Sequence, residues 1–123
     1  MKFAILSDIH SNLEGLQTVL AHANAQKCTH YVCLGDVVGY GPNPKECLDI
    51  VRKLDCPTVM GNHDEYCASD SPLTGFNPMA ADAIRWTRQQ LNEEERSWLR
   101  NLKYIRSVES FTIVHATLDL PEK

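Results

Sequence analysis

The sequence predicts an α/β protein with a parallel sheet, because three short apolar runs alternate with two helical patterns. The runs lie at residues 3–6, 30–34 and 58–60, and each ends abruptly in polar residues. A short continuous apolar run is typical of a strand that is buried on both faces of a parallel sheet. Strands joined by helices in this order form a βαβαβ arrangement with right-handed crossovers.

Both intervening helices carry recognisable start signals. In residues 12–25 apolar side chains recur at three- and four-residue spacing, after a capping-box pair of Ser11 and Glu14. The second helix is predicted to begin at Pro44, with Asn43 as its cap.

The second half of the chain departs from this alternation. Residues 67–78 are predicted to form a loop, because they hold two prolines and a glycine and show no periodicity. Two tandem helices follow, and Asn92 with Glu95 can cap the second of them. A hairpin with strands at 104–108 and 111–116 is predicted after the helices.

Composition excludes several classes of protein. The 123 residues are 43% hydrophobic and 23% charged, a composition typical of a globular domain. The formal net charge of −4 is unsuited to bulk nucleic-acid binding. The five cysteines are odd in number and form no CxxC, so we expect a reducing, cytoplasmic location. No apolar run approaches the roughly 20 residues that span a bilayer, so no membrane partner is expected.

Acids, amides and imidazoles follow the predicted strands. They are Asp8, His10, Asp36, Asn62, His63 and His115. Because the carboxyl ends of parallel strands form one ligand-binding edge, we expect these side chains to converge. Carboxylate, imidazole and amide donors suit Mn²⁺, Fe²⁺ or Zn²⁺. Each motif alone is also consistent with a polar loop that satisfies its own backbone.

Taken in order, the motifs resemble those of the calcineurin-like metallophosphoesterases. The four matching motifs are Ser7-Asp8-Ile9-His10, Gly35-Asp36, Gly61-Asn62-His63-Asp64 and Val114-His115. Three further segments resemble a bacterial and archaeal branch described as predicted phosphodiesterases: Ser11-Asn12-Leu13, Val38-Gly39-Tyr40-Gly41-Pro42 and Asn77-Pro78-Met79-Ala80-Ala81. The resemblance implies the αββα sandwich of that family, of which we expect the N-terminal part.

The resemblance implies a site for two divalent metal ions, drawn from Mn, Fe, Zn and Ni. Asp8 and His10 would bind the first ion, Asn62 and His115 the second, and Asp36 would bridge both. A metal-bridging hydroxide would hydrolyse a phosphodiester or phosphomonoester substrate.

The resemblance also implies two catalytic residues. His63 would face the substrate and stabilise developing charge or protonate the leaving oxygen, and Asp64 would orient it. Asp64 is alternatively a surface acid that starts a turn. Gly35 and Gly61 are expected to let the backbone approach the metal site closely.

One family motif has no counterpart. A Gly-His followed two residues later by a second histidine is absent after His115, and His22 and His30 lie away from the predicted site. We therefore expect residues 1–123 to form a single, incomplete domain. Its uncovered sheet face could be covered by a second copy in a homo-oligomer.

Two alternatives to a metal-dependent phosphoesterase stay open. One is a catalytically silent metal-binding or protein-interaction fragment. The other is a flavodoxin-like nucleotide-binding module, which shares the βαβ opening but has a glycine-rich phosphate loop that this sequence lacks.

Overall fold

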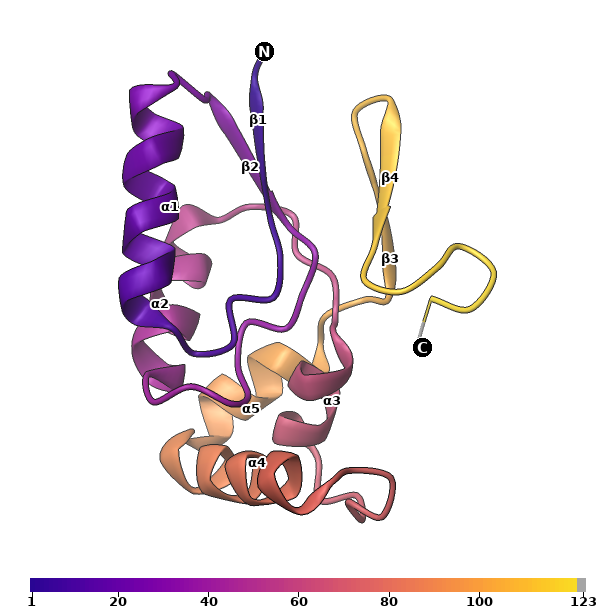
Figure 1. The fold of residues 1–123 in the computed structure, drawn as a ribbon. Coiled ribbons are helices and arrows are strands. Elements are labelled where there is room, and N and C mark those ends of the chain that lie inside the picture. The colour runs from indigo at the N-terminus through magenta and orange to yellow at the C-terminus, as the bar shows by residue number, and fades with distance from the viewer. Residues whose placement is uncertain (122–123) are drawn as a thin grey trace.

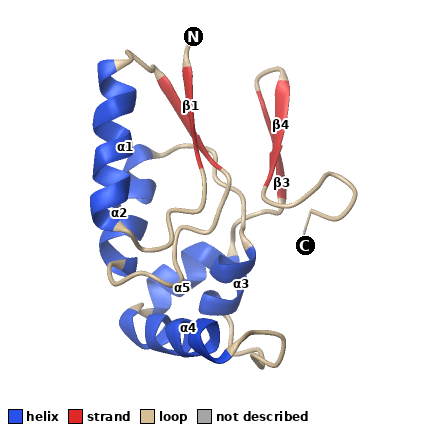
Figure 2. Ribbon diagram, in the orientation of Figure 1, coloured by secondary structure: helices blue, strands red, loops and turns tan. Residues whose placement is uncertain are grey.

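The computed structural model describes residues 1–121, and in their first half strands and helices alternate (Figure 1, Figure 2). β1 (Phe3–Leu6) pairs in parallel with β2 (His30–Cys33), the first residue of each strand opposite the other. α1 (Leu13–Ala25) connects the two strands, and α2 (Pro44–Leu54) packs against α1. The predicted alternation is confirmed for these four elements.

The start of α1 differs from the prediction. Asn12 is the N-cap, and its side chain accepts the Gly15 N–H at 2.9 Å, so the capping box of Ser11 and Glu14 is not formed. Ser11 is buried in the turn before the helix, where its own N–H donates to the Val37 carbonyl oxygen at 2.9 Å.

The third predicted strand is reduced to isolated bridges. Thr58 bridges Cys33 of β2 in the parallel sense, and Val59 bridges Lys103. The Val59 N–H donates to the Cys33 carbonyl oxygen at 3.1 Å, and the Met60 N–H donates to that of Lys103 at 2.8 Å. The segment thus runs beside β2 as predicted, but its pairing is too short for a regular strand.

Three helices follow, of which the first was not predicted. α3 (Asn62–Ala68) occupies the expected polar loop, and it is capped because the Asp64 carboxylate accepts the Gly61 N–H at 3.0 Å. α4 (Pro78–Gln90) and α5 (Glu93–Arg100) pack against α3 and confirm the tandem helices. None of the helices in residues 1–121 is long and apolar enough to cross a membrane.

Two apolar cores hold these elements together. The larger core joins both parallel strands to all five helices described above. β3 (Ile105–Val108) and β4 (Phe111–Val114) form the predicted antiparallel hairpin, which lies on the other side of the β1-β2 pair from α1 (Figure 1). A smaller core fixes the hairpin to β2: Val32, Val59, Val108 and Ile113.

β1 is partly open to solvent, so residues 3–6 are not buried on both faces as predicted. Ile5 is 61% exposed, and Val19 of α1 is 47% exposed beside it. Both border a groove of about 310 Å³ between β1 and α1.

Candidate metal centre

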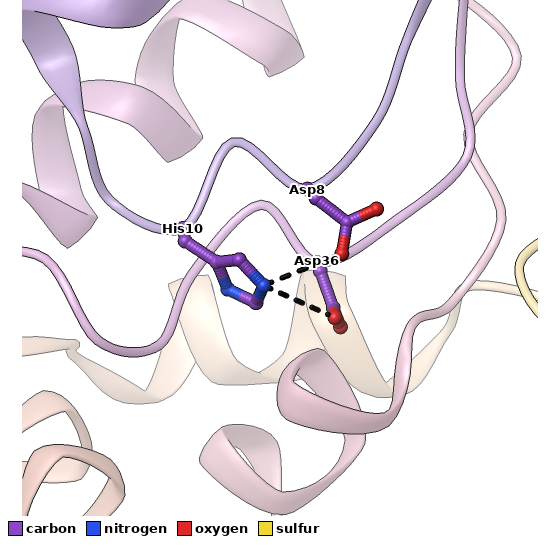
Figure 3. A group of neighbouring side chains, drawn as sticks. All are labelled: Asp8, His10 and Asp36. Atoms are coloured by element: carbon purple, nitrogen blue, oxygen red, sulfur yellow. Dashed lines mark ion pairs between the residues drawn. The ribbon is translucent and has the colours of Figure 1, made fainter. Parts of the chain in front are cut away.

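Three side chains of metal-binding types converge where β1 and β2 end (Figure 3). Asp8 and His10 lie in the loop after β1, and Asp36 lies in the loop after β2. One ligand atom from each lies within 4.8 Å of the others. His10 Nε2 is 3.3 Å from Asp8 Oδ1 and 3.4 Å from Asp36 Oδ2. The structure therefore brings together three of the predicted site residues.

His115 joins this group from the distant hairpin. It directly follows β4, and its Nε2 lies 3.3 Å from Asp36 Oδ2. Two imidazole nitrogens thus face the same carboxylate oxygen of Asp36, one from His10 and one from His115.

The opposite ring nitrogens of these histidines fix their orientation. His10 Nδ1 lies 3.1 Å from the Val38 carbonyl oxygen, and His115 Nδ1 lies 2.7 Å from that of Leu34. A carbonyl oxygen only accepts hydrogen bonds, so each Nδ1 must carry the proton. In the neutral ring Nε2 then keeps a free lone pair, as a metal ligand requires.

The two loops that carry the donors are tied to each other in a strained conformation. The Asp8 N–H donates to the Gly35 carbonyl oxygen at 3.0 Å, and the His10 N–H donates to that of Asp36 at 2.8 Å. Asp8, His10 and Asp36 all have left-handed backbones, with φ of 55°, 49° and 56°. Such conformations cost about 1–3 kcal/mol each and cluster at functional sites.

The Asp36 carboxylate is buried at the centre of the group. Its Oδ1 accepts the His63 N–H at 3.0 Å, and Oδ2 faces the two histidines. Loss of water around it raises the pKa of Asp36, while His115, the His63 N–H and His10 act in the opposite direction. A Cβ atom at Gly61 would overlap Asp36 Oδ1, so only glycine fits there. A cation at this position would offset the cost of burying the carboxylate.

His63 lies beside the donors in a cage of rings. Its ring centroid is 5.0 Å from that of His10, 4.6 Å from that of Tyr40 and 5.6 Å from that of Phe76. The ring is buried, and its Nδ1 has no hydrogen-bond partner within the described residues. Burial lowers the pKa of His63, chiefly through loss of hydration.

The contacts of Asp64 differ from those expected. The side chain is fully buried, so it is not a surface acid. Its two carboxylate oxygens accept four backbone N–H groups, from Gly61, Asp36, Val37 and Val38, at 3.0, 2.8, 2.9 and 3.3 Å. Burial raises its pKa to about 6, against the effect of these hydrogen bonds. In the structure the Asp64 carboxylate therefore binds the loop that carries Asp36, and its orienting of His63 stays a prediction.

Family membership is shown by a family model that matches almost the whole chain. The model that describes calcineurin-like phosphoesterases matches residues 1–120. The chain belongs to this family. Its helices and strands adopt the calcineurin-like fold, as the sequence motifs implied.

Similar proteins of this family are longer than the present chain. A metallophosphoesterase of Sphaerobacter thermophilus of known structure is 39% identical with a TM-score of 0.84, and the match covers 100% of this chain and 50% of that one. An uncharacterized protein of Methanocaldococcus jannaschii is 43% identical over 83% of this chain and 42% of its own. A symmetrical bis(5'-nucleosyl)-tetraphosphatase of Coxiella burnetii is 33% identical over 69% of this chain and 31% of its own. The present chain therefore spans half or less of the length of these relatives.

The donors of this calcineurin-like chain fit a divalent cation. Two carboxylates and two imidazoles with free Nε2 atoms suit borderline and hard metals, and Asp36 lies between both histidines. Asn62 is half-buried and stands between Gly61 and His63, which both adjoin the Asp36 carboxylate. The backbone of Asn62 is thus held beside the Asp36 carboxylate.

Sequence reasoning missed one residue next to these donors. Tyr40 packs on His10 and His63, with ring centroids 5.1 and 4.6 Å away. Its left-handed φ of 61° follows Gly39, whose φ is 94°. The glycine-rich segment around Tyr40 was recognised only as a family signature, although its unusual composition is a signal for such a turn.

Proposed function

We propose that this chain provides the metal-binding part of a phosphoesterase that hydrolyses phosphodiester or phosphomonoester bonds. The observation that carries the proposal is the convergence of Asp8, His10, Asp36 and His115, with both histidine Nε2 atoms directed at the Asp36 carboxylate. A buried carboxylate such as that of Asp36, held among strained backbones, is typical of a functional site.

Asp8, His10 and Asp36 would hold one divalent ion, and Asp36, Asn62 and His115 a second. A carboxylate shared by two cations offsets their mutual repulsion. When bound, such ions activate water and neutralise charge on phosphate oxygens. The hydrogen bonds from His10 and His115 to backbone carbonyl oxygens keep the Nε2 lone pairs pointed at the site.

His63 would act on the substrate itself. Its buried ring favours the neutral form, and an anionic phosphate beside it would raise its pKa and favour a proton. The ring could then stabilise the phosphate charge or protonate the leaving oxygen. Packing between Tyr40 and Phe76 holds the ring in place for this role.

The chemistry of one relative supports a phosphate-ester substrate. The Coxiella burnetii relative is named for the hydrolysis of bis(5'-nucleosyl) tetraphosphates.

All five cysteines are free thiols, which is consistent with the proposed cytoplasmic location.

The test is Mn²⁺ binding together with Mn²⁺-dependent hydrolysis of bis(p-nitrophenyl) phosphate by the purified chain. Asp36→Asn removes the central negative charge, so we expect a loss of at least about tenfold in both Mn²⁺ affinity and turnover. Asp49→Asn is the matched control, because Asp49 is an exposed acid that pairs with Lys53 at 3.0 Å.

The outcomes separate binding from catalysis. Mn²⁺ binding that depends on Asp36 without any hydrolysis would identify a catalytically silent metal-binding fragment. Unchanged binding and turnover in Asp36→Asn would refute the proposed site altogether.

A further inference from the structure

A row of packed rings leads from the metal donors to the protein surface. His10 contacts His63 and Tyr40, with ring centroids 5.0 and 5.1 Å apart, and Tyr40 stacks at a tilt on His63 at 4.6 Å. His63 is buried, whereas Tyr40 is 54% exposed. Tyr40 is thus the point where this row of rings reaches solvent.

Tyr40 also borders an open groove of about 400 Å³. One wall is the segment after Gly39, and the other is α4; the lining residues are Tyr40, Gly41, Pro42, Asp82, Ala83 and Trp86. Trp86 is 40% exposed on the face of α4 opposite its buried residues Ala80 and Ile84. The groove therefore has an accessible aromatic ring in each wall.

The position of Tyr40 is held by the loop that carries a metal donor. The Gly41 N–H lies 3.0 Å from the carbonyl oxygen of His10, to which it donates. Tyr40 itself is in the left-handed region, which a bulky residue adopts only where surrounding contacts impose it. The exposed ring is therefore fixed relative to the metal donors.

We propose that Tyr40 and Trp86 bind a flat aromatic ring of the substrate, so that the ester cleaved at the metal centre is a nucleoside phosphate. This inference rests on the proposed function for the phosphate end of the substrate. Nucleobases stack on exposed aromatic side chains whatever their sequence, because each has a π-face.

The charges around the groove favour one orientation of a nucleoside phosphate. Asp82 lies in the wall of the groove, where it pairs with Arg85 at 2.9 Å, and no unpaired cation lines the groove within residues 1–121. The groove therefore offers a phosphate no cationic partner among its lining residues. The uncharged base occupies the groove instead, and the phosphate extends past Tyr40 to the donors around Asp36.

The first test measures ring binding without turnover. The chain has two tryptophans, so Trp98→Phe leaves Trp86 as the sole tryptophan reporter. In metal-free buffer with EDTA we expect adenosine 5'-monophosphate to quench its fluorescence saturably, and ribose 5-phosphate not to quench it. Equal quenching by both compounds, or none by either, would overturn the proposal.

The second test removes each ring. In the Trp98→Phe background, Tyr40→Leu should weaken nucleotide binding by roughly 5- to 100-fold, and Tyr40→Phe, which keeps the ring, should preserve it. Trp86→Leu, assayed by equilibrium dialysis of labelled nucleotide, should weaken binding similarly. Unchanged affinity in Tyr40→Leu and Trp86→Leu, with circular dichroism confirming the fold, would refute the aromatic site.

The outcomes of these tests distinguish a failure of the aromatic site from a failure of the proposed function. Hydrolysis of bis(p-nitrophenyl) phosphate without nucleotide binding would refute the aromatic site and leave the phosphoesterase. Nucleotide binding that needs both rings, in a chain that neither binds Mn²⁺ nor hydrolyses the ester, would support the aromatic site and refute the proposed function.

Discussion

At the scale of single residues, the candidate site depends on groups that touch the Asp36 loop and are not themselves metal-ligand candidates. Asp64 places both carboxylate oxygens on four backbone N–H groups, two of them at Val37 and Val38. Removing an acceptor would leave buried donors unpaired, which costs about 1–3 kcal/mol for each group. Gly61 acts differently, because its missing side chain makes room for the Asp36 carboxylate.

Gly61→Ala tests this close approach. The added Cβ would displace the Asp36 carboxylate, so we expect Mn²⁺ affinity to fall at least about tenfold and the chain to lose about 1–3 kcal/mol of stability. Gly75→Ala is the matched control, since a Cβ there would meet nothing within 4 Å. Calorimetric titration and urea denaturation measure the two effects; normal Mn²⁺ binding by the Gly61→Ala variant would contradict the geometry.

At the scale of elements, three arginines of α4 and α5 cap the C-terminal end of the short helix α3. Arg88 donates to the Tyr66 carbonyl oxygen at 2.9 Å, and Arg100 donates to that of Ala68 at 2.7 Å. Arg96 donates to those of Cys67 and Ser69 at 3.2 and 2.9 Å. Cationic donors at the last carbonyls stabilise a helix end, so α3 depends on its neighbours for its last turn.

Arg96→Met should therefore destabilise the chain by about 1.5–3 kcal/mol, because it removes charged hydrogen bonds from partly buried carbonyl groups. Arg85→Met removes only an exposed pair with Asp82 and should cost at most about 0.5 kcal/mol. Urea denaturation compares the two variants. Equal losses would show that the carbonyl contacts of Arg96 contribute nothing specific.

At the scale of the whole molecule, the larger core decides which thiols are reactive. Cys33 and Cys67 are fully buried, and burial raises the pKa of each to about 12. Cys47 is also fully buried, with its pKa raised by burial to about 11. Cys28, beyond the end of α1, is only half-buried. Because the thiolate is the reactive form, the folded chain should separate these cysteines.

Alkylation with iodoacetamide at mildly alkaline pH checks this order. In the folded chain Cys28 should be modified first, while Cys33, Cys47 and Cys67 should stay unmodified until the chain unfolds. Peptide mass spectrometry identifies the modified sites, and the same reaction in guanidinium chloride gives the unfolded reference. Modification of Cys33 as fast as Cys28 in the native chain would show that the core is not closed.

The sequence by itself determined the first two strands, the helices between and after them, and the convergence of three candidate donors. Strands and helices of the first half follow from local periodicity, and Asp8, His10 and Asp36 converge because parallel strands end at a common edge. Periodicity did not reveal α3, since its cap is the contact between Asp64 and Gly61 and its last turn rests on distant arginines.

Only the tertiary structure decided what the side chains around those donors do. The role of Asp64, the cage around His63 and the groove between Tyr40 and Trp86 each join segments that are distant along the chain. Such contacts depend on how loops pack after the sheet has formed, and no local pattern of residues encodes that packing. The sequence thus specified a candidate metal centre, and the packing of its loops specified the surface that surrounds it.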